Sequence, residues 1–489
     1  MTTPLNRQTP RYLATANGEQ LLSTHRSRTS NTWTITMISQ NPLRYAQESD
    51  ETFVLVTGTN SGLGFAVCCR TIDEFLTTRP ESKSLTLLFT TRCSKKSEDT
   101  LPLLQAHLNK SAAKHATSKS RITLRPEHVD LCDLLSVRAL ARRLLTSLPK
   151  LDAIILNAGI LGVTGINWFK AVYMCLTELV NATTYPSPYT LRDTGVLTNK
   201  QTSQPDEPPL GQIFCTNVFG HYMLCHALMP LLSACNTTPG RVIWISSLEA
   251  TRDCFDISDI QTLKNWRAYE ASKYLTDLLA LTANLPSSSP WVDGFLSPST
   301  TETKSQQKQN TTDPDPTASC TRPNLYVAHP GICSTAILPL CLPLFSVMVV
   351  FFWIARMIGS PWHVISTYKG ACAPVWLALS PQSVLDAAEG AYVRLGGGKP
   401  KWGSSCDRLG RESPVCTEVE GWGFGGVVGP AVLDNDRRQR KKSGATDLTA
   451  EERVEFEELG RKCWREMEEL RKSWERILEK EEKARGICG

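Results

Sequence analysis

Tyr269 and Lys273 stand four residues apart, a spacing that places both side chains on one face of a helix, one turn apart. Free tyrosine has a pKa of about 10, so at neutral pH it is a poor acid or base. A neighbouring ammonium stabilises the phenolate and lowers that pKa. The pair therefore predicts acid–base chemistry. An ordinary amphipathic turn has the same spacing, so the remainder of the chain must decide between the two.

A glycine-rich turn follows the first apolar run of the chain. Residues 53–57 read FVLVT, a β-branched run that predicts a buried strand. The chain then continues directly into Gly58, Thr59, Asn60, Ser61, Gly62, Leu63 and Gly64. A strand, a glycine turn and a helix bring backbone N–H groups and a helix N-terminus against a pyrophosphate. The spacing is Gly-x-x-x-Gly-x-Gly, and it predicts nucleotide binding by Gly58, Asn60, Ser61, Gly62, Leu63 and Gly64.

The end of the next strand indicates which dinucleotide is bound. Residues 85–91 predict a strand ending at Thr91, where an NAD-binding protein places an acid on the ribose. Here Arg92, Lys95 and Lys96 follow instead, and cations suit a 2′-phosphate, so we expect NADP(H). A solvated charged loop is the alternative. A third strand, near 121–129, ends at Asp130, whose carboxylate could accept a bond from the adenine amino group.

Strands alternate with helical stretches along the chain. Further strands are expected at 153–156, before Asn157, Ala158 and Gly159, at 241–246, and at 325–328. This pattern predicts an α/β fold with a doubly wound parallel sheet. Residues 162–211 read as a polar loop that walls a substrate pocket, and 286–323 read as a disordered surface insertion.

Composition excludes several classes of protein. The chain has 489 residues, enough for a sizeable core, and a net charge of only +5, which gives no case for nucleic acid. Its 17 cysteines are scattered without Cys-x-x-Cys or zinc spacing, so no metal is expected and the thiols are expected to be reduced. Residues 1–50 read as a disordered extension, and Met37 is an alternative start.

The last part of the chain contains an apolar segment and a charged helix. Residues 336–354 carry no charge, and the segment is long enough to reach across a bilayer. Pro339 and Pro343 argue against a straight span. A dip into one leaflet, a true span and a buried core remain open for 336–358. Residues 359–448 are expected to form the C-terminal part of the domain, with loops. A capping box at Thr449 then opens an amphipathic helix to about 485. That helix packs on its own domain, on a partner helix or on a membrane surface.

Taken together, these motifs resemble the short-chain dehydrogenase/reductase family. The resemblance rests on the glycine turn, Asn157-Ala158-Gly159, Tyr269-x-x-x-Lys273 and His329-Pro330-Gly331, in that order. It implies a Rossmann domain over 51–335 and a catalytic tetrad. In that tetrad Tyr269 donates the proton, Ser247 holds the carbonyl, Lys273 lowers the tyrosine pKa and binds ribose, and Asn217 anchors a water; Ser246 is the neighbour most easily confused with Ser247. It also implies cofactor contacts, at Thr91, Arg92, Lys95, Asp130, Asn157, Ala158, Gly159, Tyr269, Lys273, Pro330, Gly331, Ile332 and Thr335.

Within that family the chain is similar to the fungal 3-keto-steroid reductases. The similarity rests on residues 56–64, 269–279 and 329–335, together with the apolar segment and the charged terminal helix. It implies NADPH-dependent reduction of a 3-keto group on a 4-methyl sterol in ergosterol biosynthesis. It further implies association with the endoplasmic reticulum membrane and lipid droplets, with the catalytic domain facing the cytosol, and with other sterol carbon-4 demethylation enzymes and oxidosqualene cyclase. The alternatives are another membrane-bound reductase of the family, for retinoid, acyl or small carbonyl substrates, and a non-catalytic scaffold.

Overall fold

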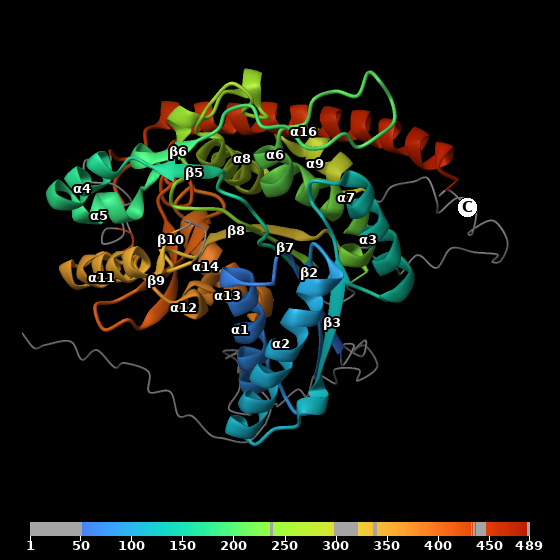
Figure 1. The fold of residues 1–489 in the computed structure, drawn as a ribbon, viewed down its shortest axis with the longest axis horizontal. Helices are drawn as coiled ribbons and strands as arrows, with labels where there is room; N and C mark the ends of the chain where they lie inside the picture. Colours follow the sequence, from blue (N-terminus) through green and yellow to red (C-terminus); the bar gives the residue numbers. More distant parts are fainter. Residues whose placement is uncertain are drawn as a thin grey trace, which may run out of the picture. The chain divides into compact units, whose positions relative to one another are not determined.

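The computed structural model describes residues 51–234, 238–297, 321–335, 340–431, 433, 436 and 446–486. Within this part of the chain, one 8-stranded sheet has the order β10-β9-β8-β7-β4-β1-β2-β3 (Figure 1). Neighbouring strands run parallel, except for the antiparallel hairpin of β9 and β10. The strands are β1 Glu51–Val56, β2 Ser84–Thr91, β3 Ile122–His128, β4 Ala153–Leu156, β7 Arg241–Ile245, β8 Asn324–His329, β9 Lys401–Cys406 and β10 Glu412–Thr417.

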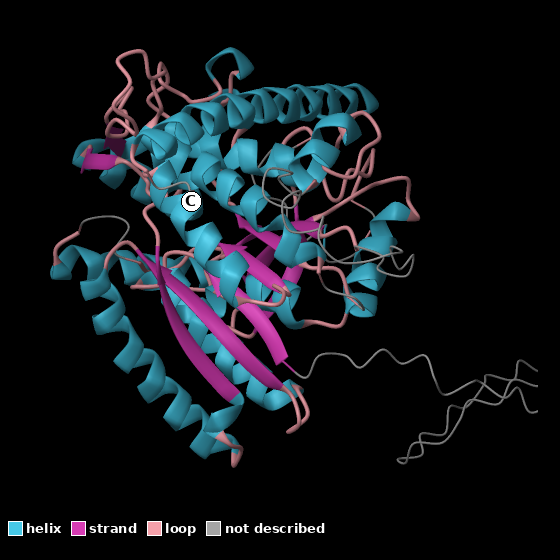
Figure 2. Cartoon of the chain, turned by 90° about the vertical axis from the view of Figure 1, so that its right-hand side faces the viewer, coloured by secondary structure: helices cyan, strands magenta, loops and turns pink. Residues whose placement is uncertain are grey.

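Helices cover both faces of this sheet, as Figures 1 and 2 show. Alternate side chains of β1 enter two separate cores: Phe53 and Leu55 pack with α3, α7 and α8, whereas Val54 and Val56 pack with α1, α2 and α13. A strand that is apolar on both faces must be covered on both, which is why the run at 53–56 lies in mid-sheet. The helices that form these layers are α1 Gly62–Thr78, α2 Ser94–His115, α3 Leu134–Ser147, α7 Gly220–Ser233, α8 Ala268–Thr282, α12 Thr367–Gly370, α13 Cys372–Leu379 and α14 Gln382–Val393.

The strand order reverses beside β1. From β1 the chain runs outward to β2 and β3, then returns to β4 on the other side and continues to β7 and β8. Such a reversal leaves a crevice at the carboxyl ends of the strands, where open α/β sheets bind their ligands. The predicted doubly wound parallel sheet is therefore confirmed, and its switch point lies where the glycine turn follows β1.

Two segments expected to be irregular carry regular structure instead. The supposed polar loop at 162–211 forms β5 Val163–Ile166, α4 Trp168–Thr177, α5 Leu179–Thr184 and β6 Thr190–Arg192. Within 286–323, residues Ser289–Leu296 form α9, since Val292 and Phe295 are buried in the core. In 359–448, the segment expected to form the C-terminal part of the domain with loops, β9 and β10 extend the main sheet. Residues 1–50, 298–320 and 336–339 lie outside the described residues, and so do the expectations made for them.

The terminal helix packs on its own domain. α16, Ala450–Ala484, begins at the predicted capping box: Glu452 N donates to Thr449 Oγ1 at 3.1 Å and Thr449 N donates to Glu452 Oε2 at 3.0 Å. Its apolar face, including the buried Cys463, Met467 and Trp474, lies against α8 and α9 (Figure 1). A glycine, Gly460, permits this close approach, because a Cβ there would lie 2.4 Å from Thr282 of α8.

Candidate active site

A cavity of about 800 Å³ occupies the carboxyl ends of the parallel strands. The glycine turn, the ends of β4 and β7, one face of α8 and the turn after β8 surround its inner part. Helices α4, α5 and α11 (Leu342–Ile358) surround its outer part. The cavity therefore joins the segments in which the sequence predicts chemistry to the segment inserted between β4 and α7.

The glycine turn is built for close approach of backbone to a ligand. Gly58 has φ +70°, and a Cβ at Gly64 would lie 2.1 Å from Gly58 O, so neither position admits a side chain. Asn157 holds the turn against β4, since its Nδ2 donates to Thr57 O at 3.0 Å. The N-terminus of the 17-residue helix α1 follows at Gly62. Backbone N–H groups at such a terminus suit a phosphate.

Nearly all the predicted cofactor residues line the cavity. They are Gly58, Asn60, Ser61, Gly62, Leu63, Gly64, Thr91, Arg92, Asp130, Asn157, Ala158, Gly159, Tyr269, Lys273, Pro330, Gly331, Ile332 and Thr335. Lys95 is the exception: it lies exposed in the first turn of α2 and does not belong to the lining. A glycine turn at one end, Arg92 beside it and a roomy crevice fit a dinucleotide. Among the described residues, no group of acids, histidines and cysteines is arranged to hold a metal.

Tyr269 and Lys273 lie on α8, as their spacing predicts, with Lys273 Nζ 5.7 Å from the ring centroid of Tyr269. The predicted effect on pKa differs. Burial, and then the Glu249 carboxylate, raise the pKa of Tyr269 above its ordinary value, and the opposing hydrogen bond comes from Ser247. Lys273 instead donates to Ile245 O at 2.8 Å. Desolvation thus outweighs the groups that act to lower this pKa, which are Ser247 and Arg192. Tyr269 remains a neutral phenol, suited to donate a proton.

Ser247 and Ser246 both border the cavity, but their hydroxyls differ. The Ser247 side chain acts to lower the pKa of Tyr269, so it lies beside the phenol, and its Oγ accepts from Glu249 N at 3.1 Å. Ser246 Oγ donates to Lys273 O at 3.2 Å and is thus engaged by the backbone of α8. The geometry favours Ser247 as the hydroxyl beside the tyrosine. A neutral phenol and a hydroxyl side by side can stabilise an oxyanion growing on a carbonyl.

Asn217 lies in a π-helical turn, Cys215–Phe219, just before α7. Its side chain bonds both backbone groups of Ile160, accepting from N at 2.8 Å and donating to O at 3.0 Å. A Cβ at Gly159 would lie 3.1 Å from Asn217 Oδ1 and 3.8 Å from Lys273 Nζ. The backbone carbonyl oxygen of Asn217 forms a hydrogen bond with Nδ1 of His221. His221 was not identified as a site residue from the sequence. Burial lowers the pKa of His221 to about 3, so its ring is neutral, and its Nε2 lies 2.9 Å from Thr57 Oγ1. His221 thereby ties the glycine turn to Asn217.

A second set of residues that sequence reasoning missed is a buried charge cluster behind Tyr269. Arg192, from β6, pairs with Glu270 of α8, and both side chains are fully buried. Glu249 accepts from Ser187 N at 3.1 Å and from Ser187 Oγ at 2.7 Å, and burial raises its pKa to about 7. Glu249 could have been identified from the sequence, because it stands two residues after Ser247. No sequence pattern pointed to Arg192, because the residues around it read as a polar loop.

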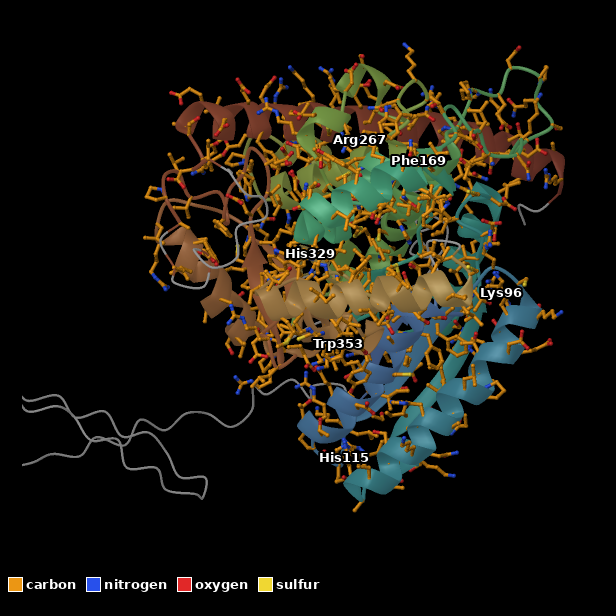
Figure 3. All side chains as sticks on the ribbon, turned by 60° about the vertical axis from the view of Figure 1, so that its left-hand side comes forward. Lys96, His115, Phe169, Arg267, His329 and Trp353 are labelled. Atoms are coloured by element: carbon orange, nitrogen blue, oxygen red, sulfur yellow. The ribbon has the colours of Figure 1, made fainter. Side chains whose placement is uncertain are left out.

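The outer cavity wall is apolar and partly open to solvent. Leu344, Val347 and Phe351 of α11 line it on one side, with Trp168 and Ala171 of α4 opposite. Figure 3 shows α4 and α11 near each other on one side of the molecule, with Phe169 and Trp353 labelled. Large apolar side chains on both helices are exposed to solvent, among them Phe169, Leu176, Leu342, Val350, Trp353, Met357 and Ile358. We call these seven residues the apolar rim.

Helix α11 makes up most of the segment 336–358, which was expected to associate with a membrane. Within the part of the chain that the structure describes, no helix combines the length and apolar character needed to cross a bilayer. The buried Arg356 donates to His363 O at 2.8 Å and Val364 O at 2.7 Å, which fastens the end of α11 to the domain. One face of this helix lines the cavity and another belongs to the apolar rim.

Comparison with known proteins identifies relatives but no family model, since none matches the chain. The chain is 56% identical over 438 residues to the 3-keto-steroid reductase erg27 of Aspergillus fumigatus, a match covering 88% of this chain and 95% of that one. A 3-keto-steroid reductase of Gibberella zeae is 38% identical over 479 residues, with 88% and 95% covered. That of Schizosaccharomyces pombe is 31% identical over 376 residues, with 75% and 90% covered.

Proposed function

The chain belongs to the 3-keto-steroid reductases, and on that premise we propose that it reduces the 3-keto group of a 4-methyl sterol intermediate to the 3β-hydroxyl with NADPH. One observation carries this proposal: Ser247, Tyr269 and Lys273 line the same cavity as the glycine turn. An acid for the substrate oxygen and a cradle for a dinucleotide thus share one space. The protein is an oxidoreductase.

The proposed roles follow from the geometry. When bound, a reduced nicotinamide supplies the hydride. Ser247 holds the carbonyl by a hydrogen bond, and Tyr269, kept neutral by burial, donates the proton as negative charge grows on the oxygen. Lys273, whose pKa burial lowers to about 8, still carries a charge at neutral pH and binds the nicotinamide ribose. Asn217 positions the backbone of Ile160 next to Gly159 and anchors a water beside Lys273.

A nicotinamide dinucleotide is the cofactor, and we infer that it is NADP(H). Support comes from Arg92, which lines the cavity directly after Thr91, where β2 ends. A guanidinium there can hold a 2′-phosphate by two hydrogen bonds. Lys95 is exposed outside the lining and contributes charge only at a distance.

The substrate class agrees with the outer cavity. A sterol is a rigid apolar body with one polar end, and the cavity offers apolar side chains from α4 and α11 with Ser247 and Tyr269 deeper inside. We propose that the 3-keto end enters first and that the ring system lies between the two helices. The reaction would belong to sterol carbon-4 demethylation.

The apolar rim supports a location at the endoplasmic reticulum membrane and lipid droplets. A sterol partitions into lipid, and a protein that contacts lipid beside its cavity takes its substrate without passing it through water. We propose that α4 and α11 rest on one leaflet, with the catalytic domain in the cytosol. Association with other sterol carbon-4 demethylation enzymes and with oxidosqualene cyclase is proposed from the resemblance alone.

Product analysis tests the function. Purified protein in detergent is incubated with NADPH and a 4-methyl 3-oxo sterol, and in parallel with retinal. Formation of the 3β-hydroxy sterol, absent with Tyr269→Phe, is expected. Reduction of retinal alone would favour another reductase of the family, and sterol synthesis in cells that persists with Tyr269→Phe would favour a scaffold.

A further inference from the structure

Lys401, the first residue of β9, is a buried lysine outside the motifs of the proposed reaction, with its side chain 1% exposed. Its Nζ donates to Asp277 Oδ2 at 2.6 Å, to Ser247 O at 2.8 Å and to Ser246 Oγ at 3.1 Å. An ammonium has three donors and no acceptor. The three acceptors therefore match a charged lysine, held where β7 ends.

Lys273 also holds the same strand end. Lys273 Nζ donates to Ile245 O at 2.8 Å, and Ser246 Oγ donates to Lys273 O at 3.2 Å. Asp277 lies one helical turn after Lys273 on α8, and its side chain is 1% exposed. Two lysines from different elements thus hold the segment from Ile245 to Ser247, with Asp277 as the shared counter-charge.

A buried ion pair is a costly way to stabilise a fold, because desolvation of both charges offsets much of their attraction. It does fix geometry, since breaking any one bond leaves a buried charge unsatisfied. Here the fixed object is the backbone of Ser247, the residue beside Tyr269. The arrangement joins the catalytic strand end to β9, which lies far along the chain.

We propose that Lys401 and Asp277 are a positioning pair, in which Lys401 holds the Ser247 backbone and the two opposite charges balance each other beside Lys273. This role of the pair rests on the proposed function. Neither side chain contacts substrate or cofactor in this role. Both act through Ser247 and Lys273.

Charges around Lys273 support this assignment. Burial lowers the pKa of Lys273 to about 8, Asp277 acts to raise it and Lys401 acts to lower it. The other titratable groups facing this cluster are Tyr269 on α8, the neutral His221 on α7, and Glu420, which acts on Lys401. Removing one member of the pair must therefore move the pKa of Lys273 in a direction set by the charge that is lost.

Opposite shifts in the pH profile provide the test. Lys401→Met leaves Asp277 facing Lys273 alone, so the pKa of Lys273 rises and the basic limb of the kcat profile moves up by about one pH unit. Asp277→Asn leaves two cations together, so that limb moves down by about one unit. Lys401→Met also lowers kcat about tenfold, because Ser247 O loses its donor. Shifts in the same direction, or no shift in folded protein, would overturn the proposal.

Two further measurements keep the outcomes separable. The pH dependence of NADPH affinity, followed by protein fluorescence in the same variants, reports on Lys273 without turnover. Wild-type protein could reduce no sterol while the pH dependence of NADPH affinity still shifts in opposite directions in the two single variants. In that case the proposed function fails and the positioning pair stands. If a single variant unfolds, the double variant Lys401→Met/Asp277→Asn is used, because it removes both charges together. The basic limb of its kcat profile should stay within about half a pH unit of wild type, while kcat itself falls about tenfold. An unchanged kcat in that variant would contradict the role of Lys401.

Discussion

The guanidinium of Arg192 lies over the ring of Tyr269, with its central carbon 5.8 Å from the ring centroid. Arg192 belongs to β6 in the inserted segment, whereas Tyr269 belongs to α8. The same guanidinium pairs with Glu270, the residue after Tyr269, with neither side chain exposed. The inserted segment is therefore fastened to α8 beside Tyr269, the proposed proton donor.

Replacing Arg192 by methionine should destabilise the protein substantially. Glu270 would remain as a buried carboxylate whose nearest cation is Arg267 at 3.9 Å, and such a loss costs about 3–5 kcal/mol of unfolding free energy. Urea unfolding measures it. Arg411→Met, which breaks an exposed pair with Asp407, is the control and should leave the free energy of unfolding close to that of wild type. Arg192→Met/Glu270→Gln should recover much of the loss; equal losses in the single and double variants would argue against a coupled pair.

Replacing Tyr269 by phenylalanine should remove the proton donor and leave cofactor binding intact. The ring, its packing and its contact with Lys273 are kept, but the hydroxyl beside Ser247 is lost. We expect kcat to fall by about 10²–10⁴-fold, with the NADPH dissociation constant within about threefold of wild type. Steady-state kinetics and fluorescence titration measure the two quantities. Turnover close to wild type would assign the acid to another group.

Replacing Glu249 by glutamine should flatten the dependence of stability on pH. Burial, with repulsion from Glu270, raises the pKa of Glu249 from 4.5 to about 7. The folded state thus binds the proton more tightly than the unfolded state, so this stabilisation is complete below pH 4.5 and is lost as pH rises to about 7. Melting temperatures measured across that window should fall more steeply for wild type than for the variant. Parallel curves would show that Glu249 ionises normally.

Replacing Arg92 by alanine should weaken NADPH binding and spare NADH. Loss of a charged hydrogen bond to a 2′-phosphate predicts at least a tenfold rise, about 1.5–3 kcal/mol, in the NADPH dissociation constant. Lys95→Ala is the matched control, because Lys95 lies outside the cavity lining, and it should change the constant by about twofold or less. Equal weakening of NADPH and NADH by Arg92→Ala would refute the 2′-phosphate contact.

Placing a charge on the apolar rim should weaken binding to lipid. Phe169 on α4 is 93% exposed and Trp353 on α11 is 50% exposed, so Phe169→Glu and Trp353→Glu leave the core unchanged. Each should reduce co-sedimentation with phospholipid vesicles about tenfold or more. Leu103→Glu, on α2 and 58% exposed, is the control and should bind as wild type does. Equal binding by all three variants would place the lipid contact elsewhere.

Local patterns of sequence sufficed for the elements that carry the proposed chemistry. The strand, glycine turn and helix around Gly58, the spacing of Tyr269 and Lys273, and the capping box at Thr449 each depend on residues within a few positions of one another, where backbone geometry alone sets their placement. The same patterns missed the helices at 168–184, because apolar side chains there face a cavity and solvent in place of a continuous core.

Only the tertiary structure determined which distant charges meet and how deeply the tyrosine is buried. Lys401 and Asp277 are separated by 124 positions, and Arg192 and Glu270 by 78. No periodicity links them, because each contact depends on how a distant strand, β9 or β6, packs against α8. Burial, likewise a property of the whole fold, decides the sign of the Tyr269 pKa shift against the opposing effects of Ser247 and Arg192. The sequence by itself determined which groups are present at the site, and the fold determined their charge.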